Sequence, residues 1–415
     1  MRRLLGKNKL TWDKYVDITL YVFIVSMIVI FEGKNSFLYL LIMANLCLAF
    51  LGQIKREKKI LFDKKVIWLI AFFVLSAVSC LWAVDINNAL SVLPILFMNE
   101  FMAYIVMVLI YRKPSRLKGV MKAIIIGTIL LGIRIILQYG PLVFIDKRMV
   151  DGFSANMLGL YGAIATNLVL YLLIKNKKAK YTLPLVVCLL IVVISFSRKA
   201  IVFSILPMIV CFVFSKRDSL KSILLRSGIT IAALIIGITS LYVVPELHNT
   251  MGVKFEAMIN GVLNTGNKTD ASVKARMNFI KYGEEMFEER PIQGWGLNNF
   301  KNMIAVRKPK GMTNTYAHNN YIEIAVDLGV IGLIVYYSLY VYMLMYGIRY
   351  YKKLDYLQLL MLSFLVTLAI CEYGLVSYYN DFIHLLLTMI WMSLMYYGDI
   401  GKRNKECSKR KMINS

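Results

Sequence analysis

The sequence predicts an all-α, polytopic integral membrane protein with about twelve transmembrane helices and one large helical extracytoplasmic loop. Three observations support this fold class. Hydrophobic residues make up 59% of the 415 residues, well above the roughly 45–50% of soluble domains. The mean hydropathy is +0.62. The apolar residues also form long uninterrupted runs, as expected of helices that cross a bilayer core of about 30 Å.

Twelve apolar runs of about 15–25 residues have the length of a membrane-spanning helix. They are residues 16–31, 36–52, 66–82, 95–111, 119–139, 157–174, 182–196, 200–215, 228–244, 320–346, 355–377 and 382–398. We therefore expect a single membrane domain over residues 1–415. Residues 245–319 form a large extracytoplasmic loop within it.

The positions of the charges predict the orientation of the chain. A net charge of +25 would suggest a nucleic-acid partner in a soluble protein. Here, the termini and one alternating set of loops contain 32 lysines and arginines, whereas the other short loops contain 5. Because positive loops stay in the cytoplasm, we expect both termini there and no nucleic-acid partner. The long loop then lies outside.

The long loop contains one amphipathic helix. Residues 271–290 place four apolar residues on one face, with Arg276 beside them: Val273, Met277, Ile280 and Phe287. Pro291 ends this helix, and residues 292–296 form a turn. The loop is too small for a deep core of its own. We expect it to lie across the outer ends of the spans as a lid.

Residues 312–337 join a polar turn to an apolar run without a break. Asn314 or Thr315 can cap a helix at this point, which would place His318 in its first turn. The helix is then expected to continue uninterrupted into the membrane.

Asn319, Glu323 and Asp327 follow at intervals of four and would form one polar stripe along this helix. Carboxylates in an apolar segment rarely face lipid, and they often mark a functional path. The alternative is structural: His318 would be a cap or surface residue, and the two carboxylates would hold neighbouring helices.

Several cations are expected at the outer face. Arg198 and Lys199 lie at the tip of a tight outer turn, where the positive-inside rule disfavours them. A phosphate-bearing ligand would explain their presence, together with Arg276 of the loop. Arg134 lies near the outer end of the fifth span, where an arginine can also simply reach the membrane interface.

His318 supplies a base to this group of cations. An imidazole with an ordinary pKa of about 6.5 can take a proton from an attacking hydroxyl near neutral pH. Outside the cytoplasm there is no nucleotide sugar, so an energised glycan donor must arrive on a lipid diphosphate, whose leaving charge cations stabilise. The outer loops contain no cluster of metal-ligand residues, so we expect no metal and no other cofactor.

Five sequence landmarks occur in a defined order. They are residues 81–85 (LWAVD), Asn156 followed by Gly159, Ser197–Arg198, Arg276 with residues 291–296 (PIQGWG) and Phe300, and His318–Asn319 followed after nine residues by Gly329 and then Gly332. Together they resemble the O-antigen ligase and polymerase family of membrane glycosyltransferases. The resemblance covers most of the chain, and its core runs from about residue 156 to residue 337.

The resemblance implies a glycosyltransferase that uses undecaprenyl-diphosphate-linked glycans at the outer face of the cytoplasmic membrane. In that family, the histidine of the HN motif is essential and is proposed to activate the acceptor. Arginines of the outer turn and the large loop hold the donor diphosphate. These roles transfer to His318, Arg198 and Arg276. Four residues are added from position alone as candidate substrate-binding residues: Arg134, Lys199, Asn319 and Glu323.

The acceptor distinguishes the members of this family. A polymerase extends a lipid-linked repeat unit, a ligase transfers the glycan to lipid A core, and a related group transfers it to protein. A Lys- and Ile-rich composition favours a low-GC genome, and a Gram-positive cell, which lacks lipid A, favours a polymerase of O-antigen, capsule or exopolysaccharide. The expected partners are lipid-linked donor and acceptor glycans, membrane lipids, and a chain-length regulator and flippase of the same pathway.

Two other classes of protein remain as alternatives. A transporter such as a lipid-linked oligosaccharide flippase would also be basic and have polar residues inside its helix bundle. The clustering of charges at one face argues against it, as does the lack of paired broken helices in matching halves. A scaffold for polysaccharide assembly is the second alternative, and it predicts that His318 is dispensable.

Overall fold

The computed structural model describes residues 11–30, 36–57, 60–141, 143–146, 149–150, 153–214, 271–308 and 314–397, which are helical almost throughout. The α-helices are α1 (Trp12–Val29), α2 (Ser36–Glu57), α3 (Lys64–Ser79), α4 (Ile86–Arg112), α5 (Arg116–Tyr139), α6 (Val143–Asp146), α7 (Ala155–Asn176), α8 (Thr182–Ile194), α9 (Arg198–Phe214), α13 (Ala271–Glu289), α14 (Phe300–Arg307), α15 (Asn320–Arg349), α16 (Tyr356–Cys371) and α17 (Asp381–Tyr396). Short 3-10 turns are η1 (Cys80–Trp82), η2 (Ala179–Tyr181), η4 (Tyr351–Lys353) and η5 (Glu372–Gly374).

Seven helical segments within the described residues are long and apolar enough to cross a membrane. They are Phe37–Arg56, Lys64–Trp82, Ile86–Arg112, Arg116–Tyr139, Ala155–Asn176, Asn320–Arg349 and Tyr356–Gly374. Two shorter apolar helical segments are Ala179–Ile194 and Asp381–Tyr396. The chain is therefore an all-helical polytopic membrane protein, apart from one small hairpin.

Eleven of the twelve predicted spans coincide with helices. The ninth, 228–244, lies outside the described residues, as do residues 245–270 of the predicted loop. Helix α4 begins at Ile86 rather than at residue 95, because the Asp85 side chain caps it by accepting hydrogen bonds from the N–H groups of Asn87 and Asn88.

The small hairpin is a departure from the predicted all-α class. Strands β1 (Met149–Val150) and β2 (Phe153–Ser154) pair antiparallel in the segment between α5 and α7. The Ser154 side chain then accepts a hydrogen bond from the Met157 N–H at 3.1 Å and caps α7.

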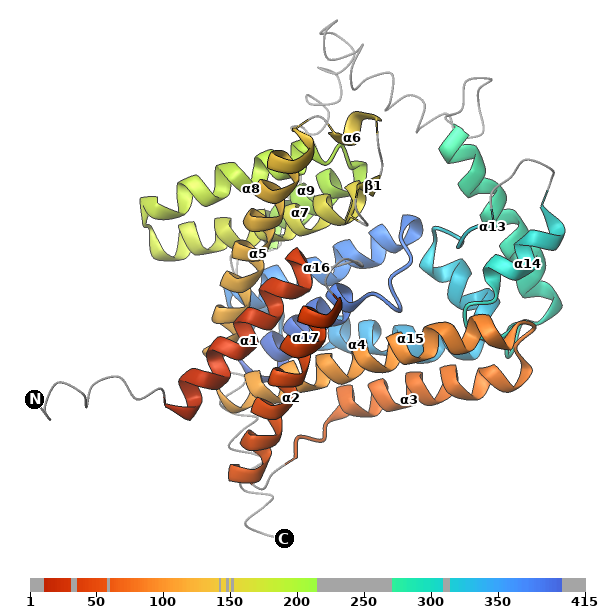
Figure 1. Cartoon of the computed structure of the whole chain (residues 1–415), viewed down its shortest axis with the longest axis horizontal. Helices are drawn as coiled ribbons and strands as arrows, with labels where there is room; N and C mark the ends of the chain where they lie inside the picture. The colour runs from red at the N-terminus through yellow and green to blue at the C-terminus, as the bar shows by residue number, and fades with distance from the viewer. Residues whose placement is uncertain are drawn as a thin grey trace, which may run out of the picture.

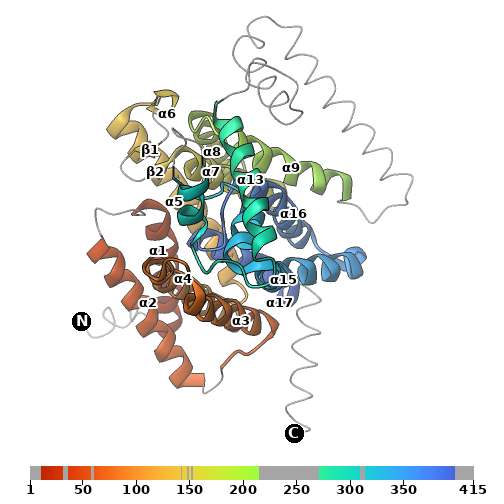
Figure 2. The ribbon, with the colours of Figure 1, turned by 90° about the vertical axis from the view of Figure 1, so that its right-hand side faces the viewer.

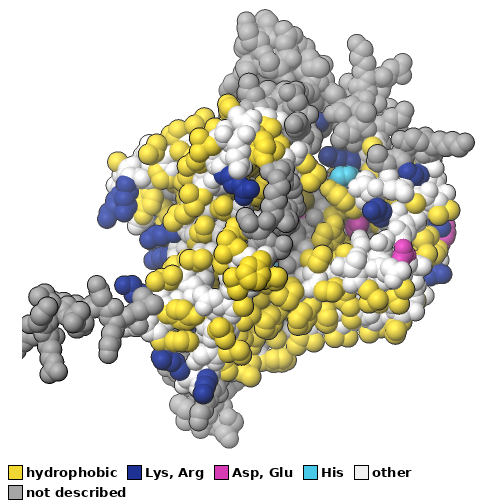
Figure 3. Space-filling model, in the orientation of Figure 1, with side chains coloured by type: hydrophobic (Ala, Val, Ile, Leu, Met, Phe, Trp, Pro, Cys, Tyr) yellow, Lys and Arg dark blue, Asp and Glu magenta, His cyan; other side chains and the backbone are white. Residues whose placement is uncertain are grey.

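The α13–α14 layer lies at one end of the helix bundle (Figure 1). Seen from that end, α13 lies across α15 (Figure 2), and it packs against both α14 and α15. Hydrophobic side chains cover much of the surface between this end and the opposite end, where lysine and arginine side chains gather (Figure 3). This distribution is the one expected of a protein whose flank contacts lipid.

Helix α7 is the most enclosed of the seven long apolar helices in the described part of the chain, with 78% of its apolar window buried. It packs against α5, α8 and α9. Two glycines permit these close contacts, since a Cβ on Gly162 would lie 3.1 Å from the Ile191 and Val192 side chains, and one on Gly159 would lie 2.6 Å from Ser195 Oγ.

Candidate active site

Helix α15 is broken at Gly329. This residue has φ 66° and ψ −164°, backbone angles that are open to glycine and costly for other residues. The sequence predicted an uninterrupted helix here, and that prediction is wrong. The apolar run carries no signal for the break, because the groups that stabilise it come from a different part of the chain.

Residues 291–296 occupy the break in α15. Four backbone hydrogen bonds of 2.8–3.4 Å join the two segments: Val330 N–H to the Pro291 carbonyl, Ile331 N–H to the Ile292 carbonyl, Trp295 N–H to the Val326 carbonyl, and Gly296 N–H to the Asp327 carbonyl. A break in a membrane helix leaves backbone groups unpaired, which is costly in apolar surroundings. The loop supplies the missing partners.

Two glycines make this backbone contact possible. A Cβ on Gly329 would lie 2.1 Å from the Ile292 carbonyl oxygen, and a Cβ on Gly294 would lie 2.5 Å from the Asp327 carbonyl oxygen. Neither distance is compatible with a real side chain. Gly329, which nine residues separate from the HN pair, and Gly294, the first glycine of PIQGWG, therefore lie on the two sides of one contact.

The end of α3 covers another side of the 291–296 loop. The Val84 N–H donates to the Trp295 carbonyl at 3.2 Å, and Trp82 Nε1 donates to the Gln293 carbonyl at 3.3 Å. Three of the five sequence landmarks, LWAVD, PIQGWG and HN with its glycine, thus meet in one place.

Asp327 is fully buried, and its carboxylate accepts four hydrogen bonds. The donors are the N–H groups of Asn298 (2.8 Å), Asn299 (3.0 Å) and Phe300 (2.8 Å) and the phenol of Tyr378 (3.1 Å). The three amides lie at the start of α14, where N–H groups lack partners within the helix, although the Asn299 N–H also donates to the Gly296 carbonyl at 3.3 Å. Asp327 therefore caps that helix and complements its dipole. This is the structural role that the sequence left open.

Asn319 caps α15. Its side-chain oxygen accepts hydrogen bonds from the N–H groups of Tyr321 (3.0 Å) and Ile322 (3.2 Å), and the helix begins at Asn320. The prediction of an upstream cap, with His318 in the first turn, is wrong. Several side chains in this segment can cap a helix, and the sequence does not choose among them.

Glu323 fixes the chain on the other side of His318. Its carboxylate accepts a hydrogen bond from the Ala317 N–H, and the residue is only 1% exposed. His318 lies between these two anchors with φ 56°, an uncommon conformation for a non-glycine residue. Asn319 and Glu323, predicted to bind substrate, are thus engaged in holding the histidine's backbone.

Aromatic rings surround the His318 imidazole. Its ring centroid lies 4.1 Å from that of Tyr316 and 6.0 Å from that of Phe279 on α13. Phe279 belongs to a small second core that joins α13, α14 and the start of α15. This core attaches the α13–α14 layer to the segment that carries the histidine.

Helix α13 itself was predicted, but its buried face was not. Phe279 and Met286 are almost completely buried, and Gly283 lies against Ile322, where a Cβ would approach to 2.2 Å. The predicted apolar stripe, which included Met277, is offset from this face and only half-buried. Hydrophobicity alone did not identify the glycine as a contact residue.

Two cations act on His318. Burial, with the positive charges of Arg276 and Lys199, lowers the pKa of His318 from 6.5 to about 4. Arg276 and Lys199 also repel each other electrostatically. The imidazole is therefore neutral above a pH of about 4 and free to accept a proton. Near α13, Figure 3 shows a histidine side chain beside lysine and arginine side chains.

These three residues come from separate elements. Arg276 is on α13, His318 precedes α15, and Lys199 is in the first turn of α9. The Lys199 chain also lies against the turn after α16, since a Cβ on Gly374 would be 3.3 Å from Lys199 Cε. Arg198, the first residue of α9, is exposed beside Lys199.

The turn before α9 is held by two further sequence landmarks. Ser197 Oγ donates to Asn156 Oδ1 at 3.0 Å, and the lack of a side chain on Gly159 leaves room for Ser195 and Ala200. The start of α7 therefore sets the position of Arg198 and Lys199.

Arg134 is bound elsewhere. Its Nη1 donates to the Val29 carbonyl at 2.9 Å, its Nε to Gln138 at 3.2 Å, and its guanidinium lies 5.2 Å from the centre of the Phe153 ring. Val29 is the last residue of α1, so Arg134 satisfies a carbonyl at a helix end. These contacts give Arg134 a structural task, and its predicted substrate contact stays a prediction.

A further buried carboxylate, Glu372, was missed by the sequence analysis. Glu372, in the turn after α16, accepts hydrogen bonds from three hydroxyl groups: Tyr337 (3.0 Å), Tyr340 (2.7 Å) and Ser377 (2.5 Å). This network ties α15 to the turn that contacts Lys199. The sequence did contain a signal for this network: a glutamate directly after an apolar run, with several tyrosines in the preceding span.

Residues 183–337 match the model of a protein family described as O-Antigen ligase. The match includes Arg198, Lys199, Arg276, His318, Asn319 and Glu323, whereas Arg134 lies outside it. No curated protein matches the chain. Residues 183–337, less than half of the chain, are therefore similar to the O-antigen ligase family.

Proposed function

We propose that this protein is a polysaccharide polymerase. It transfers a growing glycan from undecaprenyl diphosphate to a lipid-linked repeat unit at the outer face of the cytoplasmic membrane. The observation that carries the proposal is a neutral histidine, held on both sides, next to the cations Arg276 and Lys199. Transfer of a glycan from a diphosphate needs these two parts, a base and an anion site.

In the proposed reaction, His318 takes the proton of an acceptor hydroxyl as that oxygen bonds to the anomeric carbon of the donor. The bond from this carbon to the diphosphate oxygen breaks, and the diphosphate leaves with the electron pair. Arg276, Lys199 and Arg198 offset its charge. The imidazolium then releases its proton to solvent.

Charge links the two parts of the proposed site. Burial and the positive charges of Arg276 and Lys199 lower the pKa of His318 to about 4. A bound diphosphate would neutralise these cations and raise the pKa of His318. The histidine would then become a stronger base only when the donor is in place.

A groove of about 610 Å³ supports a lipid-linked substrate. It lies among α1, α2, α4 and the start of α17, and it is lined by five methionines: Met27, Met43, Met98, Met102 and Met157. Methionine side chains adapt to irregular apolar ligands such as an isoprenoid chain. Tyr379 lines the groove and interacts electrostatically with Glu323, so this part of the groove is near the His318 segment.

The test is extension in vitro with purified protein and one synthetic undecaprenyl-diphosphate repeat unit, with products separated on a gel. We expect a ladder of longer lipid-linked glycans, lost in His318→Ala and retained in Lys301→Ala, an exposed residue of α14. No ladder, but transfer after a second acceptor is added, would make the protein a ligase. Movement of lipid-linked sugar across proteoliposomes without transfer would make it a transporter.

A further inference from the structure

A second groove lies away from the candidate active site, among α1, α2 and α5. Its volume is about 760 Å³. Apolar side chains such as Val25, Val29 and Ile42 line most of it, and Ser115, Lys118 and Lys122 are at one end. On the topology predicted from the positive-inside rule, this end faces the cytoplasm. The groove has no part in the proposed reaction.

The groove follows one stripe of α5. Lys118, Lys122, Ile126 and Leu130 are exposed at intervals of four residues and line it in this order. From Lys118 to Leu130 the helix rises about 18 Å, at roughly 1.5 Å per residue. One leaflet of a bilayer core is about 15 Å deep. The groove therefore has the depth of one acyl chain, with two cations at its polar end.

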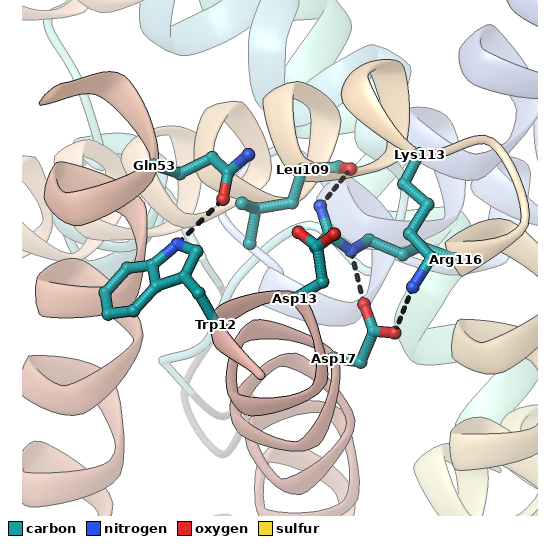
Figure 4. Close-up of polar contacts among 7 residues, drawn as sticks. All are labelled: Trp12, Asp13, Asp17, Gln53, Leu109, Lys113 and Arg116. Atoms are coloured by element: carbon teal, nitrogen blue, oxygen red, sulfur yellow. Dashed lines mark hydrogen bonds and ion pairs between the residues drawn. The ribbon is translucent and has the colours of Figure 1, made fainter. Parts of the chain in front are cut away.

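Hydrogen-bond donors dominate the polar end. The described side chains that line it are Tyr21, Ser115, Lys118 and Lys122, and no carboxylate of the described residues is among the lining. The nearby carboxylate of Asp17 accepts from Lys113 Nζ at 2.5 Å and from Arg116 Nε at 2.6 Å, as Figure 4 shows. Its charge is thus already offset. Neither Lys118 nor Lys122 forms an ion pair with a described residue.

The chain around the polar end is fixed in place. Arg116, only 1% exposed, bonds both Asp17 of α1 and the Leu109 carbonyl of α4. Gly119 admits the Tyr21 ring, because a Cβ there would lie 2.1 Å from the Tyr21 hydroxyl oxygen. This contact places the Tyr21 ring beside the α5 turn that carries Lys118 and Lys122. These contacts fix α1 and α5 relative to each other at the polar end of the groove.

We propose that this groove binds one glycerophospholipid with an anionic headgroup, its acyl chain along Val25, Val29 and Leu130 and its phosphate on Lys118 and Lys122. A zwitterionic lipid would bring its own cation to these two ammonium groups and bind less well. Basic pockets between membrane helices on the cytoplasmic side recognise anionic headgroups by the same charge complementarity.

The test is native mass spectrometry of the full-length protein, titrated in detergent with phosphatidylglycerol or phosphatidylcholine. The wild type should retain phosphatidylglycerol preferentially. Lys118→Gln/Lys122→Gln should bind it about 30-fold more weakly, at roughly the value of one surface cation for each lysine. Lys118→Arg/Lys122→Arg should retain it.

The matched control is Lys177→Gln/Lys178→Gln. It makes the same charge change at exposed lysines after α7, outside the groove, and should bind phosphatidylglycerol as the wild type does. Ile126→Trp fills the groove and should reduce retention while both lysines remain. Equal retention of the two lipids by the wild type would overturn the proposal. So would unchanged phosphatidylglycerol binding in either groove variant.

Discussion

The hydrogen bonds of Asp327 allow a quantitative prediction. Each carboxylate oxygen accepts two bonds: one pairs with the N–H groups of Asn299 and Phe300, and the other with the Asn298 N–H and the Tyr378 phenol. In Asp327→Asn, the amide nitrogen must face one of these pairs of donors. If the amide nitrogen faces the Asn298 N–H and Tyr378, the Tyr378 hydroxyl can rotate and accept a hydrogen bond from it. The buried Asn298 N–H is then left unpaired, at a cost of about 1–3 kcal/mol.

Hydrogen exchange of the peptide that contains residues 297–308 measures this cost. A loss of about 1–3 kcal/mol of local stability corresponds to exchange about 5- to 150-fold faster. Asp327→Ala leaves all four donors without their acceptor and should have the larger effect. Peptides from α7, which does not contact α14, should exchange at the wild-type rate in both variants.

Glu289→Ala is the matched control for α14. Glu289 pairs with Arg307 at the other end of this helix, at 2.5 Å, but the pair is solvent-exposed. Such pairs contribute little, so the exchange rate of residues 297–308 should stay near that of the wild type. If residues 297–308 exchange no faster in Asp327→Ala than in Glu289→Ala, Asp327 does not hold the start of α14. The structural role assigned to Asp327 as a helix cap is then refuted.

Three further predictions concern the break in α15 and the charges. Gly329→Ala should destabilise the protein by more than about 3 kcal/mol in thermal unfolding. The control is Gly140→Ala, which should cost far less stability because Gly140 has φ 81° but open space around it. Equal losses of stability in the two variants would contradict a clash between residue 329 and the Ile292 carbonyl. Arg276→Gln removes a cation and should raise the pKa of His318 above its value of about 4 in an NMR titration. An unchanged pKa would show that Arg276 does not act electrostatically on His318. Arg198→Lys should weaken donor binding, since a point charge does not replace a bidentate fork; unchanged affinity would remove Arg198 from the site.

Sequence reasoning succeeded where the physics is local. Hydropathy located the seven described helices that are long and apolar enough to cross a membrane, and periodicity located α13, because burial in lipid or against a neighbour acts on the residues themselves. The count of twelve spans stays a prediction. Lys199, Arg276 and His318 were grouped from the sequence by their charges, and in the structure they lie close enough to interact electrostatically. Their roles in a site stay predictions.

Sequence reasoning failed where a residue's partner is distant. Glu323 and Asp327 lie on the same predicted stripe, yet one holds the backbone before His318 and the other caps α14. The break at Gly329 depends on carbonyls contributed by residues 291–296. Arg134 was grouped with the outer cations by its depth in the membrane, but its partner is the end of α1. Depth and spacing do not specify which neighbour a polar group finds.

The broken helix also has a consequence for biogenesis. The 291–296 loop contacts Trp82, 211 residues earlier in the chain, and α15, which is synthesised after the loop. During synthesis, the loop leaves the translocon before the helix that completes its hydrogen bonds exists. Residues 291–296 can therefore complete these hydrogen bonds only after α15 has been synthesised, and the segment that holds His318 acquires its geometry late.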